Sequence, residues 1–277
     1  MGFFTNGSVK NITIGANVKF VNGSMYNAFY GCSYLNSPIN VPNGVTNMML
    51  AFGYCNNFNS LVTIPNSVTQ LCKIFYSCNL FNQPITIPNG VTNLSNAFGG
   101  CRNFNQPVVV PNGTSDVSSM LTTCYGFNQP VTIPNSVTNL YMTIAHCVNL
   151  NSPVTFSDKV QNNTTAGYMF TNCQKFNQPV TIPNGVGNLS RMFNNCSSMS
   201  QNITILATSV SNVRGMLYGK NNSKRINIIV PAGSATNTRM ANTSSSYSVV
   251  SAAISWTQDT ANNRYYNSTY NIYVYYV

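Results

Sequence analysis

Residues 78–101 read CNLFNQPITIPNGVTNLSNAFGGC, and nearly everything between residues 25 and 220 is a variation on this stretch. Counted from the cysteine, apolar residues stand at +3, +7, +9, +13, +16, +19 and +20, with Asn at +4 and +11 and Pro at +6 and +10. The next cysteine follows at +23. A fixed period of this length is the signature of a repeat protein. The register joins six cysteines at intervals of 23 residues and two more after one interval of 26: Cys32, Cys55, Cys78, Cys101, Cys124, Cys147, Cys173 and Cys196.

A unit of 23 residues is too short to enclose its own apolar side chains, so it must stack on copies of itself in a solenoid. Within the unit, Pro84–Pro88 alternates apolar and polar residues between two prolines, which predicts a very short strand with Ile85 and Ile87 facing inward. The following Asn89-Gly90 pair turns the chain. We expect a mainly β fold with one short parallel strand in each 23-residue coil.

Several of these motifs resemble a known repeat family. IPNSVT at 64–69 and 133–138, with AFGYC and AFGGC ending at Cys55 and Cys101, resembles the BspA-like (treponemal-type) leucine-rich repeat. FNQP is similar to repeats in mycoplasma-type surface lipoproteins and occurs at 81–84, 104–107, 127–130 and 176–179. The resemblance covers roughly residues 20–232 and implies a leucine-rich-repeat solenoid. Members of that family are mostly surface adhesins or binding proteins, and the resemblance implies no particular ligand.

The pattern divides the chain into three parts. Residues 1–24 read as an entry coil with a strand at Ile12–Ile14, and residues 25–232 form the solenoid. Residues 233–277 read as a cap, with a short helix over 235–243 and then a tyrosine-rich β-module. Its tyrosines suit cap packing, a subunit interface or a sugar-binding face, because each has an apolar ring and a polar tip. The candidate interface residues are Tyr265, Tyr266, Tyr270, Tyr273, Tyr275 and Tyr276.

The composition limits the function classes. Only 6% of the residues are charged and none is Glu, which is typical of extracellular repeats and virion fibres rather than intracellular enzymes. The formal net charge is +10, but the Lys and Arg residues are scattered along the chain instead of forming one basic stripe. We therefore expect no specific nucleic-acid partner. A diffuse positive field favours contact with an anionic cell envelope, and ordinary solvated surface charges remain the alternative.

Export and membrane signals are absent from the sequence given. No apolar run of about 18 residues could span a membrane, and the first residues, MGFFTN, show no basic segment followed by an apolar one. A phage structural protein reaches the outside of a cell without either signal. We therefore expect a virion location, with a bacterial cell surface or secretion as the alternative.

The eight register cysteines are expected to form a ladder of small buried side chains. Cysteines at equivalent positions on parallel coils point the same way, which is poor geometry for a disulfide. Zinc would need closely spaced pairs such as CxxC, and the sequence has none. Cys72 is the one thiol outside the register.

Candidate catalytic residues are lacking. His146 stands beside Cys147, but adjacent residues point in different directions and Cys147 belongs to the core ladder. Asp116, Asp158 and Asp259 lie far apart in the array, so a carboxylate pair has no candidates. We expect no enzyme activity, no cofactor and no metal site.

Two polar columns remain. Position +8 lies between the inward-facing strand residues and is therefore expected to face outward, about 4.8 Å from its neighbours. As a candidate binding face it includes Thr63, Thr86, Thr132, Thr155 and Thr181, although β-propensity alone explains threonine there. The +4 asparagines, such as Asn82, are expected to bond turn backbone. The wider interval before Cys173 places three extra residues within 161–168, where insertions often mark a binding face and otherwise reflect a tolerant surface loop.

Together these features predict a non-enzymatic phage virion protein, a tail fibre, receptor-binding or decoration component that contacts the host cell surface. The alternative is a BspA-type bacterial surface adhesin that binds glycan or protein. Expected partners are other virion proteins or copies of the chain, and a host envelope glycan or protein, without membrane insertion.

Overall fold

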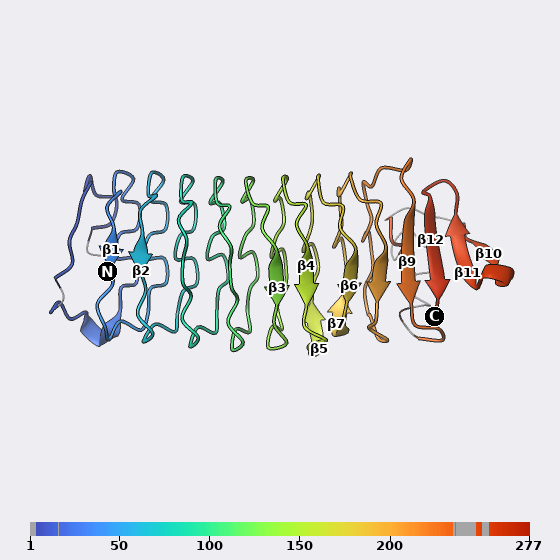
Figure 1. Ribbon diagram of the computed structural model, residues 1–277, viewed down its shortest axis with the longest axis horizontal. Helices are drawn as coiled ribbons and strands as arrows, with labels where there is room; N and C mark the ends of the chain where they lie inside the picture. The colour runs from blue at the N-terminus through green and yellow to red at the C-terminus, as the bar shows by residue number, and fades with distance from the viewer. Residues whose placement is uncertain (1–3, 16, 235, 237–247, 251–254) are drawn as a thin grey trace.

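The computed structural model describes the chain except for residues 1–3, 16, 235, 237–247 and 251–254. The coils stack side by side along one axis, with the N-terminus at one end of the stack and the C-terminus at the other (Figure 1). This confirms the mainly β solenoid with a repeat of about 23 residues. The predicted helix over 235–243 lies almost wholly outside the described residues.

The regular elements are short. Two 3₁₀ turns, η1 (Val21–Gly23) and η2 (Thr260–Asn262), accompany twelve strands. The strands are β1 (Ile39–Asn40), β2 (Val62–Thr63), β3 (Val131–Ile133), β4 (Val154–Phe156), β5 (Lys159–Thr165), β6 (Val180–Ile182), β7 (Asn184–Asn188), β8 (Ile203–Ile205), β9 (Ile226–Val230), β10 (Thr257–Asp259), β11 (Arg264–Asn267) and β12 (Ile272–Tyr276).

The expected continuous parallel sheet is broken into pieces. β1 pairs with β2 and β3 with β4, and a six-stranded sheet has the order β10-β11-β12-β9-β8-β6. The prediction of a strand in every coil is wrong at 85–87 and 108–110, which lie outside the named strands. Prolines that cannot extend a ladder flank both segments, but they also flank β3 and β6, so the prolines alone do not explain the missing strands. The stack therefore depends mainly on other contacts between coils.

The three extra residues lie in β5. Lys159 pairs with Asn184, and Thr164 pairs with Val186, so five steps along β5 match two steps along β7. The insertion is thus a bulge between residues 159 and 164, within the same coil as β4. β4 and β6 are neighbours that do not hydrogen-bond as strands, and the sheet is interrupted there.

The core consists of columns of like side chains. Phenylalanines at +20 stack along the axis, with ring centroids 5.2 Å apart for Phe29 and Phe52 and 5.5 Å apart for Phe52 and Phe75. A second column at +3 runs beside the first, and the centroids of Phe75 and Phe81 are 3.9 Å apart. These buried columns contribute aromatic contacts between coils along the core.

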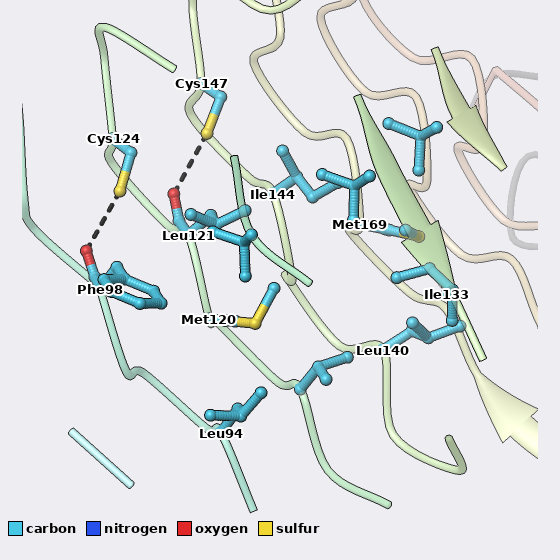
Figure 2. Close-up of a cluster of buried hydrophobic side chains, with 14 of the residues drawn as sticks. Leu94, Phe98, Met120, Leu121, Cys124, Ile133, Leu140, Ile144, Cys147 and Met169 are labelled. Carbon is cyan, nitrogen blue, oxygen red and sulfur yellow. Dashed lines mark hydrogen bonds between the residues drawn. The ribbon is translucent and has the colours of Figure 1, made fainter. Parts of the chain in front are cut away.

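The eight register cysteines lie in the core beside these columns. Seven of the thiols donate to the carbonyl of the residue three positions before the cysteine of the preceding coil, as Cys124 Sγ does to Phe98 O and Cys147 Sγ to Leu121 O, both at 3.1 Å (Figure 2). The eighth, Cys32 Sγ, donates to Phe4 O in the entry coil. Burial raises the pKa of the Cys173 thiol to about 12 and holds that of Cys196 well above its ordinary value. The Cys173 and Cys196 thiols are therefore protonated donors at neutral pH.

Asparagine side chains tie the turns together in two further columns. The +4 ladder is present as predicted: Asn59 N donates to Asn36 Oδ1 at 2.8 Å, and the bond recurs in each coil until Ser200 N donates to Asn177 Oδ1. At +15, Asn or Asp accepts from the amide two residues later. Asp116 belongs to this column, because its Oδ1 accepts from Ser118 N at 2.8 Å.

The segment before each cysteine has an unusual backbone. The residues five and one positions before it have positive φ in every coil, for example 54° at Ser119 and 64° at His146. Between these positions the backbone amides alternate in their partners. Ala97 N donates to Leu94 O within the same turn, and Phe98 N donates to Met120 O in the next coil. A left-handed conformation costs a residue with Cβ about 1–2 kcal/mol. Hydrogen bonds between coils hold it in place.

The entry coil continues the stack without the predicted strand. Ile12–Ile14 is not assigned as a strand, because Ile12 N bonds to Ser37 Oγ at 3.0 Å instead of to a backbone carbonyl. Asn36 N donates to Lys10 O at 3.0 Å and Cys32 Sγ to Phe4 O at 2.6 Å. Residues 4–24 therefore follow the contacts of the regular coils.

Replacing Ser119 by Gly is expected to raise the free energy of unfolding by about 0.5 kcal/mol, because the relief of left-handed strain exceeds the entropy gained by the unfolded chain. The neighbouring Ser118 has no positive φ, so Ser118→Gly should lower the same quantity by about 1 kcal/mol. Urea denaturation of both variants measures the difference. Equal destabilisation would contradict the strain argument.

Alkaline pH is expected to destabilise the fold. Below the ordinary thiol pKa of 9.0, both the folded and the unfolded chain keep their protons. Above it, the unfolded chain releases protons that the buried thiols retain, so the free energy of unfolding falls by up to about 1.4 kcal/mol per pH unit for each buried thiol. Urea denaturation at pH 7 to 10 checks this expectation.

A thiol-reactive dye provides the control. In the folded protein it should label Cys72, which is partly exposed, and spare the eight ladder cysteines. All nine should react in urea. Labelling of ladder cysteines under native conditions would show that the core opens, and the pH argument would then fail.

Candidate functional site

The threonine column lies on the outer face of the sheet segments. Thr132 is exposed between two buried neighbours, and Thr63 and Thr155 are exposed between a buried and a partly buried one, in agreement with strand alternation. Thr86 is also exposed, in an extended segment outside the named strands. The hydroxyls of Thr132 and Thr155 lie 3.2 Å apart and share a hydrogen bond, so the column is internally ordered on β3 and β4.

A shallow cavity of about 350 Å³ lies on this face where the sheet is interrupted. Thr155 and Thr181 contribute to its lining from β4 and β6, and Asp158 does so from the turn before the insertion. Phe156, Pro179, Pro183 and Leu206 provide apolar surface. We call this cavity the sheet-break groove. It combines two column threonines, a carboxylate and apolar walls, which is the mixture typical of a ligand site.

The tyrosine-rich strands extend the same sheet. β12 pairs in parallel with β9, whose partner β8 continues to β6. Across this sheet one row runs through residues that face outward: Thr181 is paired with Thr204, Thr204 with Ile229, Ile229 with Tyr275, and Tyr275 with Arg264. Along β12, Ile272 and Val274 alternate with Tyr273 and Tyr275 and are fully buried. Thr181 of the predicted binding face and Tyr275 of the predicted interface therefore lie in one outward-facing row of this sheet, whereas Thr155 lies beyond the sheet interruption.

The six tyrosines have different environments. Tyr266 and Tyr273 stack on the outer face, with centroids 5.7 Å apart, while Tyr265 packs edge to face against Tyr276 at 5.4 Å. Burial raises the pKa of the Tyr276 hydroxyl, which has no hydrogen-bond partner among the described residues. Tyr270 packs against the core. Cap packing thus involves Tyr265, Tyr270 and Tyr276, and the outer surface involves the other three.

Two arginines join the outer tyrosines. The Arg225 guanidinium lies 3.9 Å from the Tyr273 ring centroid, and that of Arg264 lies 5.1 Å from it. Arg264 forms a 2.8 Å ion pair with Asp259. The Asn262 side-chain amide, followed by Arg264, lowers the pKa of Asp259. Sequence reasoning missed these arginines, because their approach depends on β12 lying between β9 and β11.

The residues considered for catalysis remain separate. His146 Nδ1 lies 3.2 Å from Asn172 Nδ2, while the Cys147 thiol bonds to Leu121 O in the core. Asp116 caps a turn, Asp158 lines the groove and Asp259 pairs with Arg264. Among the described residues, no cluster of three or more His, Cys, Asp or Glu could hold a metal ion. No helix in the described part of the chain is long and apolar enough to cross a membrane.

Comparison with known proteins agrees with this architecture. The chain is similar to a leucine-rich repeat protein from Bacteroides ovatus ATCC 8483 whose crystal structure is known, with a TM-score of 0.56 and 20% sequence identity. The match covers 79% of this chain and 58% of that one, so this chain spans less than two thirds of its length. At this identity the likeness establishes the fold.

The family comparison extends over most of the repeats. No match is found among curated proteins. The family described as "Mycoplasma protein of unknown function, DUF285" matches residues 23–133, 73–183 and 134–229. The predicted resemblance to BspA-like and mycoplasma-type repeats is thereby confirmed. Leucine-rich-repeat solenoids are typically binding scaffolds, and the matches include no enzyme family. Because the matched segments span most of its length, the chain belongs to the DUF285 family of mycoplasma-type repeat proteins.

Proposed function

We propose that the chain is an adhesin-like, non-enzymatic surface protein that binds glycan or protein ligands through the outer face of its sheet. The supporting observation is the outward-facing row that leads from Thr181, which lines the sheet-break groove, to Tyr275, beside which Arg225 packs on Tyr273. Aromatic rings, arginine and hydroxyls on one rigid sheet are the groups that ligand-binding surfaces use.

The same proposal assigns roles to the three parts of the chain. Residues 25–232 present the ligand-binding face, residues 1–24 begin the stack, and residues 233–277 cap the core while extending that face. The expected partners are envelope glycans or proteins, without specific nucleic acid and without membrane insertion. A surface or secreted location follows from the adhesin-like role.

The phage-virion role is the less favoured candidate. It was suggested by the low content of charged residues, which the fibres of virions share with extracellular repeats. The family and the solved leucine-rich repeat protein lend it no support. The surface role accounts for the same composition and is also supported by the family's resemblance to surface repeats.

Binding of the purified chain to a glycan array and to immobilised extracellular-matrix proteins tests the surface role. Leu206 lines the groove and is 44% exposed, so Leu206→Asp should keep the fold and lower affinity for the retained ligand about tenfold. Leu80 is 43% exposed but does not line the groove, so Leu80→Asp should change affinity less than twofold. Absence of any ligand, or equal loss in both variants, would contradict the proposal.

A further inference from the structure

A second ordered surface lies on the other side of the core from the sheet. The segment before each cysteine faces the core with its apolar residues. In the coil that ends at Cys147, Leu140 and Ile144 are buried in the same core that Ile133 enters from β3 (Figure 2). The remaining side chains of the segment therefore face away from the threonine column. Four of them, one on each of four successive coils, form what we call the Tyr–Arg stripe: Tyr141, Tyr168, Arg191 and Tyr218.

The stripe is a continuous row of contacts. The rings of Tyr141 and Tyr168 meet edge to face, with centroids 5.6 Å apart and an interplanar angle of 62°. The Arg191 guanidinium then lies 5.7 Å from the Tyr168 centroid and 5.9 Å from the Tyr218 centroid. At the spacing of stacked coils, four members extend over about 14 Å. Tyr141 is 42% and Tyr218 50% exposed, so the ends of the stack are open to solvent.

The backbone holds the stripe in place. Tyr168 and Arg191 have φ of 60° and 51°, and both amides bond to the next coil, to Ser190 O and Arg214 O at 2.9 Å. Gly167 lies beneath Tyr141, since a Cβ there would lie 3.8 Å from Cδ2 of that ring and 3.1 Å from Ser190 Oγ. The stripe is therefore preformed, which reduces the entropy lost when a ligand binds.

Electrostatics favour an anionic ligand. Asp116 lies on the coil next to Tyr141 and three coils from Arg191, because its bridge partner is Asn139. Asp158 lines the sheet-break groove, and in the described part of the chain the one ion pair is between Arg264 and Asp259. Arg191 therefore has a full positive charge without a carboxylate partner in that part of the chain. Stacking uses the faces of a guanidinium and leaves its N–H edges free for a carboxylate or sulfate.

Polar side chains lie beside the stack. Asn195 Nδ2 donates to Asn172 Oδ1 at 2.9 Å, and Asn172 in turn contacts His146. In the turn that follows Arg191, the buried Asn194 Oδ1 has no hydrogen-bond partner within the described structure. Flat exposed rings, an unpaired guanidinium and amide groups together match a sugar ring that bears an acid group. Aromatic faces suit the apolar side of such a ring, and arginine suits its anion.

We propose that the Tyr–Arg stripe binds a linear acidic polysaccharide, with sugar rings on Tyr141, Tyr168 and Tyr218 and a carboxylate or sulfate on Arg191. The biological setting of this site rests on the proposed surface role, but the surface is separate from the sheet-break groove. A neutral polysaccharide of the same length should bind the stripe much more weakly, because it lacks the partner for Arg191.

Calorimetry of the full chain with polygalacturonate, dextran sulfate and neutral dextran tests the site and distinguishes carboxylate from sulfate. Arg191→Gln should weaken binding of the preferred polyanion about tenfold. Lys175→Gln removes the same charge from an exposed position outside the stripe and should change affinity less than twofold. Tyr218→Leu, which leaves the net charge unchanged, should weaken binding at least threefold, and circular dichroism and melting temperature confirm that each variant is folded.

The controls separate the stripe from the general positive charge of the chain. If Arg191→Gln and Lys175→Gln have equal effects and Tyr218→Leu has none, polyanions bind through the diffuse field alone and the stripe is not a site. If none of the polyanions binds, the inference also fails. Leu206→Asp should leave polyanion binding intact, so failure of the groove proposal and failure of the stripe proposal give different results.

Discussion

Hydrogen bonding between successive coils is the constraint on which the rest of this structure depends. Alternate amides of the segment before each cysteine donate to the next coil, and the +4 asparagines repeat a bond of about 2.8 Å across the turns. These bonds require that equivalent residues lie side by side. Residues at one position of the repeat therefore form a column along the solenoid, and the chemical type of that residue determines the chemistry of the surface or core that the column forms.

The cysteine column shows how this constraint selects residues. A carbonyl three positions before each cysteine already accepts one amide bond, from Cys101 N to Phe98 O for example, and receives a second from the thiol of the next coil. Cysteine suits this position because it is small and apolar enough to be buried and its S–H is a weak donor to the carbonyl. The same turn requires left-handed backbone at the residues five and one positions before the cysteine, which is unfavourable for residues with a Cβ. The chain tolerates Leu50, Met142 and Arg191 there because the coils on each side hold the backbone in place.

The two candidate surfaces arise from the two sides of each coil. Strand alternation directs one set of side chains outward from the sheet, and the tight segment before each cysteine directs another set away from it. The sheet side combines hydroxyls, an apolar groove and the terminal tyrosines. The other side carries the stack around Arg191. A solenoid can thus present two different candidate ligand surfaces without an enclosed active site.

The sequence by itself determined the period, the solenoid, the family and the inward columns, because these depend on spacing and on apolar residues that must be buried. It also determined the Asn36 to Asn177 ladder, since one residue type recurs at one position. Only the tertiary structure decided where the sheet breaks, because hydrogen bonding between proline-flanked segments depends on their actual separation. The joining of Thr181 to Tyr275 and the stacking of Arg191 between Tyr168 and Tyr218 also required the fold. Tyr168 and Arg191 share the position five residues before a cysteine, but Tyr218 and Tyr275 do not, and only the path of the backbone through space brings these residues together.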